Sequence, residues 1–255
     1  MGLFQMLATM SNAAPRRPLL ILFGFESNSG GQALNTDADP SELEPNPLVQ
    51  ILVPATGLFA DLDIGTNQNT AHAGLNTTYH GWHLGLSEQM KAGTGWPRAP
   101  LYICEGGQGG SQLTQWNDEA DTYYMALLAR ADAAVDEVTT LEGVPPLVVM
   151  FVSFGINDAI HHPDDAATWG PGFEVVLDRL KDRYDIRLFC MDIIPSVNAA
   201  YDEYRDAIEA LAASRSDILL QDMEGKDMED ENHLSYLGMK QITPEKMTAV
   251  RARLG

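Results

Sequence analysis

The chain has 255 residues, of which 45% are hydrophobic, and its formal net charge at pH 7 is −20. This length fits one large α/β domain, and the hydrophobic content excludes a disordered chain. The negative charge repels phosphate groups, which argues against a large surface for nucleic acid or for an anionic membrane. A saline habitat and simple solubility both account for so acidic a surface.

Residues 1–17 contain a short apolar patch, but no basic residue precedes it as in a secretory signal. We therefore expect a loose N-terminal tail over 1–17 and a single domain over 18–255, with a cleaved signal as the alternative. No apolar run reaches the roughly 18 residues of a membrane-spanning helix. The compartment stays open, with the cytoplasm slightly favoured. Cys104 and Cys190 are predicted to be buried free thiols rather than a disulfide.

Short apolar runs alternate with amphipathic stretches along the chain. The runs predict buried strands at Leu19–Phe25, Leu101–Cys104, Leu147–Phe154, Ile186–Ile194 and Ile218–Leu220. Helical spacing of apolar residues occurs around 124–135, 173–184 and 204–211, and a last helix is expected from about Tyr236 toward Arg253, with Pro244 as an interruption. This alternation predicts a three-layer α/β/α sandwich with a central parallel sheet of about five strands.

The segment from Asn35 to Thr78 does not follow the alternation. It is rich in Asn, Asp, Thr, Gly and Pro, and its one strand candidate, Val49–Val53, is weak. We interpret it as a long excursion from the first crossover, and long loops on compact domains often carry function.

Chemically useful side chains follow the predicted strands at their carboxyl ends, where open α/β sheets bind ligands. Ser27 follows the first strand, a glycine-rich turn at 105–111 follows the second, and Asn157 follows the third. Asp230 and His233 lie in the final loop. Because these ends share one edge of the sheet, we expect a nucleophile, a glycine turn, an amide and an acid–base pair to converge there.

This combination suits nucleophilic catalysis. A serine hydroxyl needs a base to take its proton, histidine can do so near neutral pH, and an aspartate three residues earlier can orient the imidazole. Glycine-turn N–H groups and an asparagine amide can stabilise a negative oxygen. Each piece also has a structural alternative: Ser27 as a helix N-cap, Gly106–Gly110 as a tight turn, Asn157-Asp158 as a helix cap, and Asp230 as part of a solvated acidic run.

Four short motifs occur in order from Leu19 to about Gly238. They are Ser27 in a glycine-rich turn, a Gly-Gly-Ser turn at 109–111 with Trp116 after it, Gly155-x-Asn157-Asp158, and Asp230-x-x-His233. With them the chain resembles the SGNH (GDSL-like) hydrolases, most closely the sialate O-acetylesterase and acetylxylan-esterase-like branch. Gly81–Leu86 and the residues after His233 also fit that branch. Phe25 is a departure, because the family usually has glycine two positions before the serine.

The resemblance implies an SGNH-hydrolase/flavodoxin-like fold and a serine esterase that removes O-acetyl or other short acyl groups from a carbohydrate. By resemblance Ser27 is the nucleophile, His233 the base and Asp230 its orienting acid. The implied oxyanion donors are Asn157, the backbone N–H of Ser27, and either Gly109 or Gly110. The partner is then an acetylated carbohydrate, and no cofactor is implied.

Two rival functions stay open. The same residues can act on lipid, thioester or aryl esters, although the polar excursion and the lack of an apolar cap segment speak against long acyl chains. A non-catalytic carbohydrate-binding protein on the same scaffold is the second rival, and Phe25 is the feature that favours it.

Other residues were considered for the substrate or for a metal. Trp116 is the favoured sugar-stacking platform, with a buried core tryptophan as the alternative. Asn67 and His72 in the long excursion are predicted to line the acyl-acceptor side of the cleft. No metal is expected, because the histidines lack Cys or carboxylate partners at zinc spacing (His72, His80, His83, His161 and His162).

Overall fold

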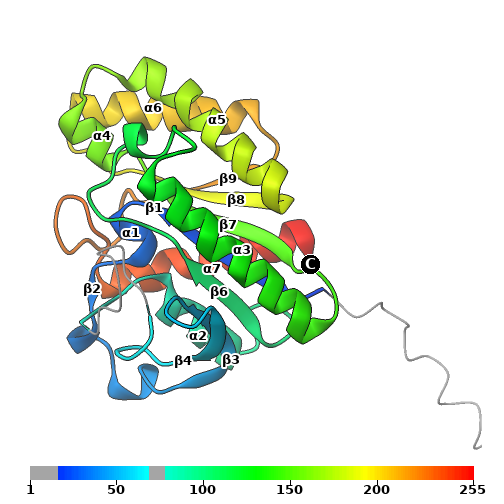
Figure 1. Cartoon of the computed structure of the whole chain (residues 1–255). Helices are drawn as coiled ribbons and strands as arrows, with labels where there is room; N and C mark the ends of the chain where they lie inside the picture. The colour runs from blue at the N-terminus through cyan, green and yellow to red at the C-terminus, as the bar shows by residue number, and fades with distance from the viewer. Residues whose placement is uncertain (1–16, 69–77) are drawn as a thin grey trace, which may run out of the picture.

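Seven strands form one sheet in the middle of the computed structural model, which describes residues 17–68 and 78–255 (Figure 1). Their order across the sheet is β4-β3-β6-β1-β7-β8-β9. Neighbouring strands run parallel except β3 and β4, which pair antiparallel at one edge. The strands are β1 (Leu19–Phe25), β3 (Asn46–Val53), β4 (Leu58–Leu62), β6 (Leu101–Glu105), β7 (Leu147–Ser153), β8 (Ile186–Ile193) and β9 (Ile218–Asp222).

Smaller elements and helices complete the described part of the chain. A separate antiparallel pair consists of β2 (Ala33–Leu34) and β5 (Tyr79–His80). The α-helices are α1 (Ser27–Gly30), α2 (Trp82–Lys91), α3 (Thr122–Glu142), α4 (Ile156–His161), α5 (Ala166–Tyr184), α6 (Ala199–Ser214) and α7 (Tyr236–Leu254). The 3-10 helices are η1 (Asn35–Asp37), η2 (Pro40–Glu42) and η3 (Leu113–Gln115).

Helices cover both faces of the sheet, which explains the continuous apolar sequence of its central strands. Every residue of β1 is buried. Successive residues of β1 point to opposite faces: the α-carbon of Gly24 faces Leu127 of α3, whereas the Phe23 ring contacts Trp82 of α2. Helix α2 packs against α7, and α5 packs against α6 beside β8 and β9. Figure 1 shows α3 and α7 on opposite sides of the sheet, so the predicted three-layer α/β/α sandwich is confirmed.

The five predicted strands are present, each ending within two residues of its expected bounds. The sheet contains two strands more than expected, β3 and β4. For this region the sequence indicated only a weak strand at Val49–Val53. These two strands form an antiparallel hairpin at the edge, and several of their residues are exposed. Apolar residues therefore do not form the unbroken run that marks a strand buried on both faces.

Three predicted helical faces are confirmed in α3, α5 and α6, which bury Leu127, Phe173 and Tyr204, respectively, against the core. The expected interruption at Pro244 is wrong, because α7 runs through it from Tyr236 to Leu254. Thr243 and Lys246 on either side are fully buried. Packing on both sides therefore holds the helix although proline removes one of its hydrogen bonds.

Other expectations have different outcomes. Cys104 and Cys190 are free and buried, as predicted. Within 17–68 and 78–255, no helix is both long and apolar enough to cross a membrane. The division between a tail at 1–17 and a domain at 18–255 stays a prediction, because residues 1–16 lie outside the described part.

A buried ion pair joins α7 to the sheet. Lys246 of α7 and Asp192 of β8 are both fully buried, and their Nζ and Oδ1 atoms are 2.6 Å apart. The ammonium group also donates to the Cys190 carbonyl at 3.2 Å and lies 4.5 Å from the centre of the Trp82 ring system. Burial raises the pKa of Asp192 to about 6 although Lys246 lowers it. Removal of either side chain would therefore leave the other as an unpaired buried charge.

We expect Lys246→Met to lower the free energy of unfolding by about 3 kcal/mol, because it leaves the Asp192 carboxylate buried without a counter-ion. Urea denaturation at pH 8 measures this. The control is Lys226→Met, which removes the more solvated Lys226–Glu245 pair and should change the free energy by less than about 1 kcal/mol. Equal losses in the two variants would contradict the prediction.

Candidate active site

Ser27 lies at the turn that connects β1 to α1, at the carboxyl edge of the sheet. It is the first residue of the short helix α1, and its exposed fraction is only 6%. The turn is bent by Phe25, whose backbone φ of +86° is one that side-chain-bearing residues rarely adopt. Phe25, two positions before the serine, thus has a backbone conformation that glycine usually adopts.

The Phe25 ring is held in an aromatic cluster beneath the turn. It is fully buried and lies within 5.0 Å, centre to centre, of Trp116, Phe154 and Phe173. Buried aromatic rings contribute both apolar area and specific ring contacts. This packing compensates for the backbone strain, so the turn keeps its positive φ although position 25 is a phenylalanine.

Ser27, His233 and Asp230 form a continuous hydrogen-bonded line, called the Ser–His–Asp line below. The Ser27 Oγ atom is 2.9 Å from His233 Nε2, although 206 positions separate the two residues. On the other side of the ring, His233 Nδ1 lies 2.9 Å from Oδ1 and 2.8 Å from Oδ2 of Asp230. The hydroxyl, imidazole and carboxylate are therefore within direct reach of one another.

The loop that carries His233 is fastened to the serine turn by Asn28. The Asn28 side chain donates to the Asn232 carbonyl at 2.7 Å and accepts from the Leu234 N–H at 3.1 Å. Tyr201 of α6 donates to the Asn232 side chain at 2.6 Å and supports the same loop. Both neighbours of His233 are thus fixed relative to Ser27. Sequence reasoning missed this function of Asn28, for which adjacency to the serine was the only signal.

Asp230 is arranged as an ionised acceptor. Besides the imidazole, its Oδ1 accepts from the backbone N–H groups of Asn232 at 2.7 Å and His233 at 2.9 Å. Partial burial acts to raise the pKa of Asp230, but the hydrogen bonds from His233 and Asn232 outweigh it and hold the pKa below its usual value. Although acidic residues surround it in sequence, Asp230 is tied to His233 rather than only solvated.

Asn157 lies beside the serine turn, where the Glu26 carboxyl group holds it. Glu26 is fully buried and accepts from the Asn157 side-chain amide at 2.9 Å, the Asn157 backbone N–H at 3.2 Å and the Ile156 N–H at 3.2 Å. Burial raises the pKa of Glu26 to about 7, against the lowering effect of these hydrogen bonds. The sequence motifs contained no signal for this buried acid next to the serine.

The glycine-rich turn after β6 packs directly on the serine turn. A Cβ atom at Gly107 would lie 2.0 Å from the Ser29 hydroxyl, so a larger residue there would displace that hydroxyl from its bond to the Glu26 carbonyl. The Gln108 N–H donates to the Phe25 carbonyl at 2.5 Å. Farther along the turn, Gly109 is half-buried, whereas Gly110 is exposed, with a φ of +73°. The turn therefore joins the same edge as Ser27 and Asn157.

Asp158, the last residue of the Asn157 motif, connects two of the loops. It is buried, and its Oδ1 accepts from the Leu113 N–H at 3.0 Å. Burial raises its pKa. It therefore caps η3, in the loop after the glycine turn, rather than the helix that contains it.

Three residues predicted to contact the substrate have different outcomes. Trp116 is fully buried against Phe25, so the stacking prediction is wrong in this structure and the core alternative fits. Asn67 uses its amide within its own turn, accepting from Asp63 N–H at 2.9 Å and donating to the Asp61 carbonyl at 2.7 Å. His72 lies outside the described residues.

Two histidines of the described chain, His80 and His83, are fully buried. His80 bonds to the Asn35 side chain at 2.9 Å, and His83 lies 3.5 Å from Glu105. Burial lowers the pKa of His80 to about 4 and that of His83 to about 3. In the part of the chain that the structure describes, no group of three or more His, Cys, Asp or Glu side chains is placed to hold a metal ion.

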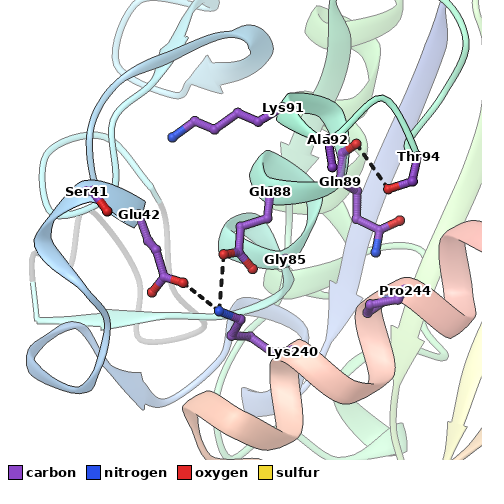
Figure 2. A pocket seen from close by; sticks show the side chains of 10 residues that line it. All are labelled: Ser41, Glu42, Gly85, Glu88, Gln89, Lys91, Ala92, Thr94, Lys240 and Pro244. Carbon is purple, nitrogen blue, oxygen red and sulfur yellow. Dashed lines mark hydrogen bonds and ion pairs between the residues drawn. The ribbon is translucent and has the colours of Figure 1, made fainter.

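Two cavities lie near the start of α7. One of about 490 Å³ borders the final loop and is lined by Asp37, Asp227, Met228, Glu229, Ser235, Tyr236 and Leu237. Figure 2 shows the other, of about 590 Å³, between η2, α2 and α7. Lys240 reaches Glu42 at 2.5 Å and Glu88 at 3.1 Å in it. Its carboxylates are thus paired within the protein, and none of Ser27, His233 and Asp230 lines it.

Comparison with known proteins shows the fold. No family model and no curated protein sequence matches the chain. Among solved structures, a protein from Arabidopsis thaliana has a TM-score of 0.67 at 16% identity, over 94% of this chain and 100% of its own. A carbohydrate acetylesterase from Xanthomonas citri has a TM-score of 0.57 at 11% identity, and a family two carbohydrate esterase from Cellvibrio japonicus has 0.51 at 14%.

The chain spans 56% of the length of the Xanthomonas citri esterase chain and 62% of the Cellvibrio japonicus one. The alignments cover 93% and 94% of the chain itself. The chain thus shares the fold that these carbohydrate esterases contain.

The strained turn allows a direct test. Phe25→Ala and Phe25→Gly both remove the buried ring, which should lower the free energy of unfolding by about 3–5 kcal/mol. Because φ is positive at this position, we expect the glycine variant to be the more stable of the two by about 1 kcal/mol. Urea denaturation measures both.

Phe154 is the matched control, since it is buried in the same aromatic cluster without a positive φ. There alanine should be more stable than glycine, as is usual. The same order at both positions would count against strain at Phe25.

Proposed function

We propose that the protein is a serine esterase of the SGNH type that removes O-acetyl or other short acyl groups from a carbohydrate. Ser27 is the nucleophile, His233 the base and Asp230 the acid that orients it. The observation that carries the proposal is the Ser–His–Asp line, with 2.9 Å between Ser27 Oγ and His233 Nε2 and 2.8 Å between His233 Nδ1 and Asp230 Oδ2. These distances are those at which such a set transfers protons.

The reaction begins when Ser27 Oγ attacks the ester carbonyl carbon and its proton passes to His233 Nε2. Asp230 holds the Nδ1–H and stabilises the imidazolium that forms. When the tetrahedral intermediate collapses, the bond to the sugar oxygen breaks and the imidazolium protonates that oxygen. Water then attacks the acyl carbon on Ser27 and gives one proton to His233. The bond between that carbon and Ser27 Oγ breaks as the proton passes to Oγ, and the carboxylic acid leaves and ionises in solution.

Negative charge develops on the carbonyl oxygen during both attacks and requires donors that are already in place. We assign this task to the Asn157 side chain, the Ser27 backbone N–H and a glycine of the 109–110 pair. Asn157 donates one amide hydrogen to Glu26, which leaves its second hydrogen for the substrate. Of the two glycines, half-buried Gly109 is the better candidate, because Gly110 is exposed.

The carbohydrate part of the proposal has separate support. The structures that share the fold include carbohydrate esterases, one of them a family two carbohydrate esterase from Clostridium thermocellum in complex with cellohexaose. Screening acetylated saccharides for released acetate tests the substrate class, and a preference for long-chain esters would favour a lipase instead.

A non-catalytic sugar-binding protein is the second candidate, and Phe25 is the residue that favoured it. The turn around Phe25 retains a glycine-like backbone, and Ser27 bonds to His233. Both features support turnover. Labelling of Ser27 by a fluorophosphonate probe distinguishes the two functions, since only an activated serine reacts.

Replacing the nucleophile gives the most direct prediction. Ser27→Ala and His233→Ala should each lower kcat for p-nitrophenyl acetate by roughly 10⁴–10⁶, because either change removes the proton transfer on which attack depends. Ser41→Ala, at an exposed serine of η2, should retain full activity. Unchanged rates in Ser27→Ala, with an unchanged circular dichroism spectrum, would falsify the mechanism.

A further inference from the structure

The Glu26 carboxyl group has no part in the reaction steps above. It directly precedes Ser27 and is fully buried. Its backbone N–H donates to the Ser153 carbonyl at 3.2 Å, and its own carbonyl accepts from the Ser29 hydroxyl at 2.6 Å. The residue is thus fixed at both its main chain and its side chain.

The carboxyl oxygens connect the serine turn to the start of α4. Oε1 accepts from the Ile156 N–H. Oε2 accepts from the backbone N–H of Asn157 and from its side-chain amide. The side-chain bond turns the Asn157 amide so that one hydrogen points to Glu26. The orientation of the other hydrogen, which the proposed function assigns to the reacting oxygen, then follows from the planar geometry of the amide.

We propose that Glu26 is a positioning residue of the active site: its buried carboxyl group aims the Asn157 amide at the reacting carbonyl, and its ionisation opposes the negative charge that develops there. This inference rests on the proposed function, because it needs an oxyanion on Asn157. It makes Glu26 the group that lowers activity on the alkaline side.

The geometry explains why ionisation opposes the reaction. Two acceptors of one amide NH₂ group, each about 2.9 Å from the nitrogen, lie about 5 Å apart. Unit negative charges at that separation inside a protein repel enough to slow a reaction on the order of a hundredfold. The imidazolium gains less from the Glu26 charge, because Asp230 already pairs with it at 2.8 Å.

The other ionisable groups around Glu26 do not account for a change between pH 7 and 9. The Asp158 carboxylate on α4 acts on Glu26 itself, because its negative charge raises the pKa of Glu26 by repulsion. Burial and the charges of Glu26, Glu231 and Asp230 raise the pKa of Tyr201 on α6 to about 12. In the final loop, the pKa of Asp230 is lowered, so this carboxylate is already ionised below pH 7. Since burial raises the pKa of Glu26 to about 7, its titration falls in this window.

The test is the pH profile of kcat/KM for p-nitrophenyl acetate from pH 5 to 9.5, corrected for spontaneous hydrolysis. The wild type should lose activity above pH 7, by about tenfold to a hundredfold at pH 9. Glu26→Gln should be less active at its best pH, because its NH₂ group faces the Ile156 N–H, but its rate should change less than about twofold between pH 7 and 9.

Glu231→Gln is the matched control, since Glu231 is exposed and next to Asp230. It removes an equal charge near the site and should keep the alkaline loss. If Glu26→Gln does not fold, Glu26→Asp replaces it. The shorter acid still titrates but cannot span both Ile156 and Asn157, so kcat should fall at least about tenfold at every pH with the alkaline loss retained.

The two proposals fail in different ways. A wild type that hydrolyses no short ester, and whose Ser27 takes no fluorophosphonate label, overturns the proposed function. A wild type that is active but has a constant rate from pH 7 to 9.5 overturns the role of Glu26 alone. An equal alkaline loss in Glu26→Gln also overturns it.

Thermal stability gives a readout that is independent of activity. Because the pKa of Glu26 is raised in the folded protein, its ionisation destabilises the fold as the pH rises from about 4.5 to above 7. The melting temperature of Glu26→Gln relative to the wild type should therefore increase from pH 5 to pH 8.5. A difference that is independent of pH would overturn the assignment of the titration to Glu26.

Discussion

The hydrogen bonds of Asn28 hold Ser27 and His233, which are far apart in the sequence, within hydrogen-bond distance of each other. Its amide bonds to the residues on either side of His233, donating to Asn232 at 2.7 Å and accepting from Leu234 at 3.1 Å. Because Asn28 follows Ser27 directly, these bonds transmit the position of the serine turn to the imidazole. One of these hydrogen bonds is buried and the other is partly buried, and both go to backbone groups, so they define that position more strictly than contacts with a flexible side chain would.

Two carboxyl groups near this junction lie in opposite environments. The Asp230 side chain is 54% exposed and accepts hydrogen bonds from His233 and from two backbone N–H groups, so it remains charged. Glu26 accepts three hydrogen bonds but has no solvent-exposed surface, and burial dominates its pKa. Such a separation of two acids by their surroundings allows one to stay ionised while the other titrates near neutrality. Neither environment can be read from the residue types alone.

The sequence predicted the parts of the fold that depend on burial over several consecutive residues. Continuous apolar runs located β1, β6, β7, β8 and β9, whereas the half-exposed hairpin of β3 and β4 has no such run. The order of the motifs predicted that Ser27, Asn157 and His233 lie at one edge of the sheet, because parallel strands share their carboxyl ends. Ser27 and His233 are within hydrogen-bond distance there. The prediction that Trp116 stacks on a sugar was wrong, because it rested on the position of Trp116 after the glycine turn in the sequence. That position does not indicate that the Trp116 ring packs against the buried Phe25 ring.

The wide separation of Ser27 and His233 along the chain has a consequence for synthesis on the ribosome. Ser27 emerges early, but the imidazole follows 206 residues later, and the loop that holds it lies between β9 and α7, the last strand and the last helix of the described chain. During most of translation the nascent polypeptide therefore contains Ser27 without its hydrogen-bond partner. The Ser–His–Asp line forms only after the final segments have been made and have packed against the sheet.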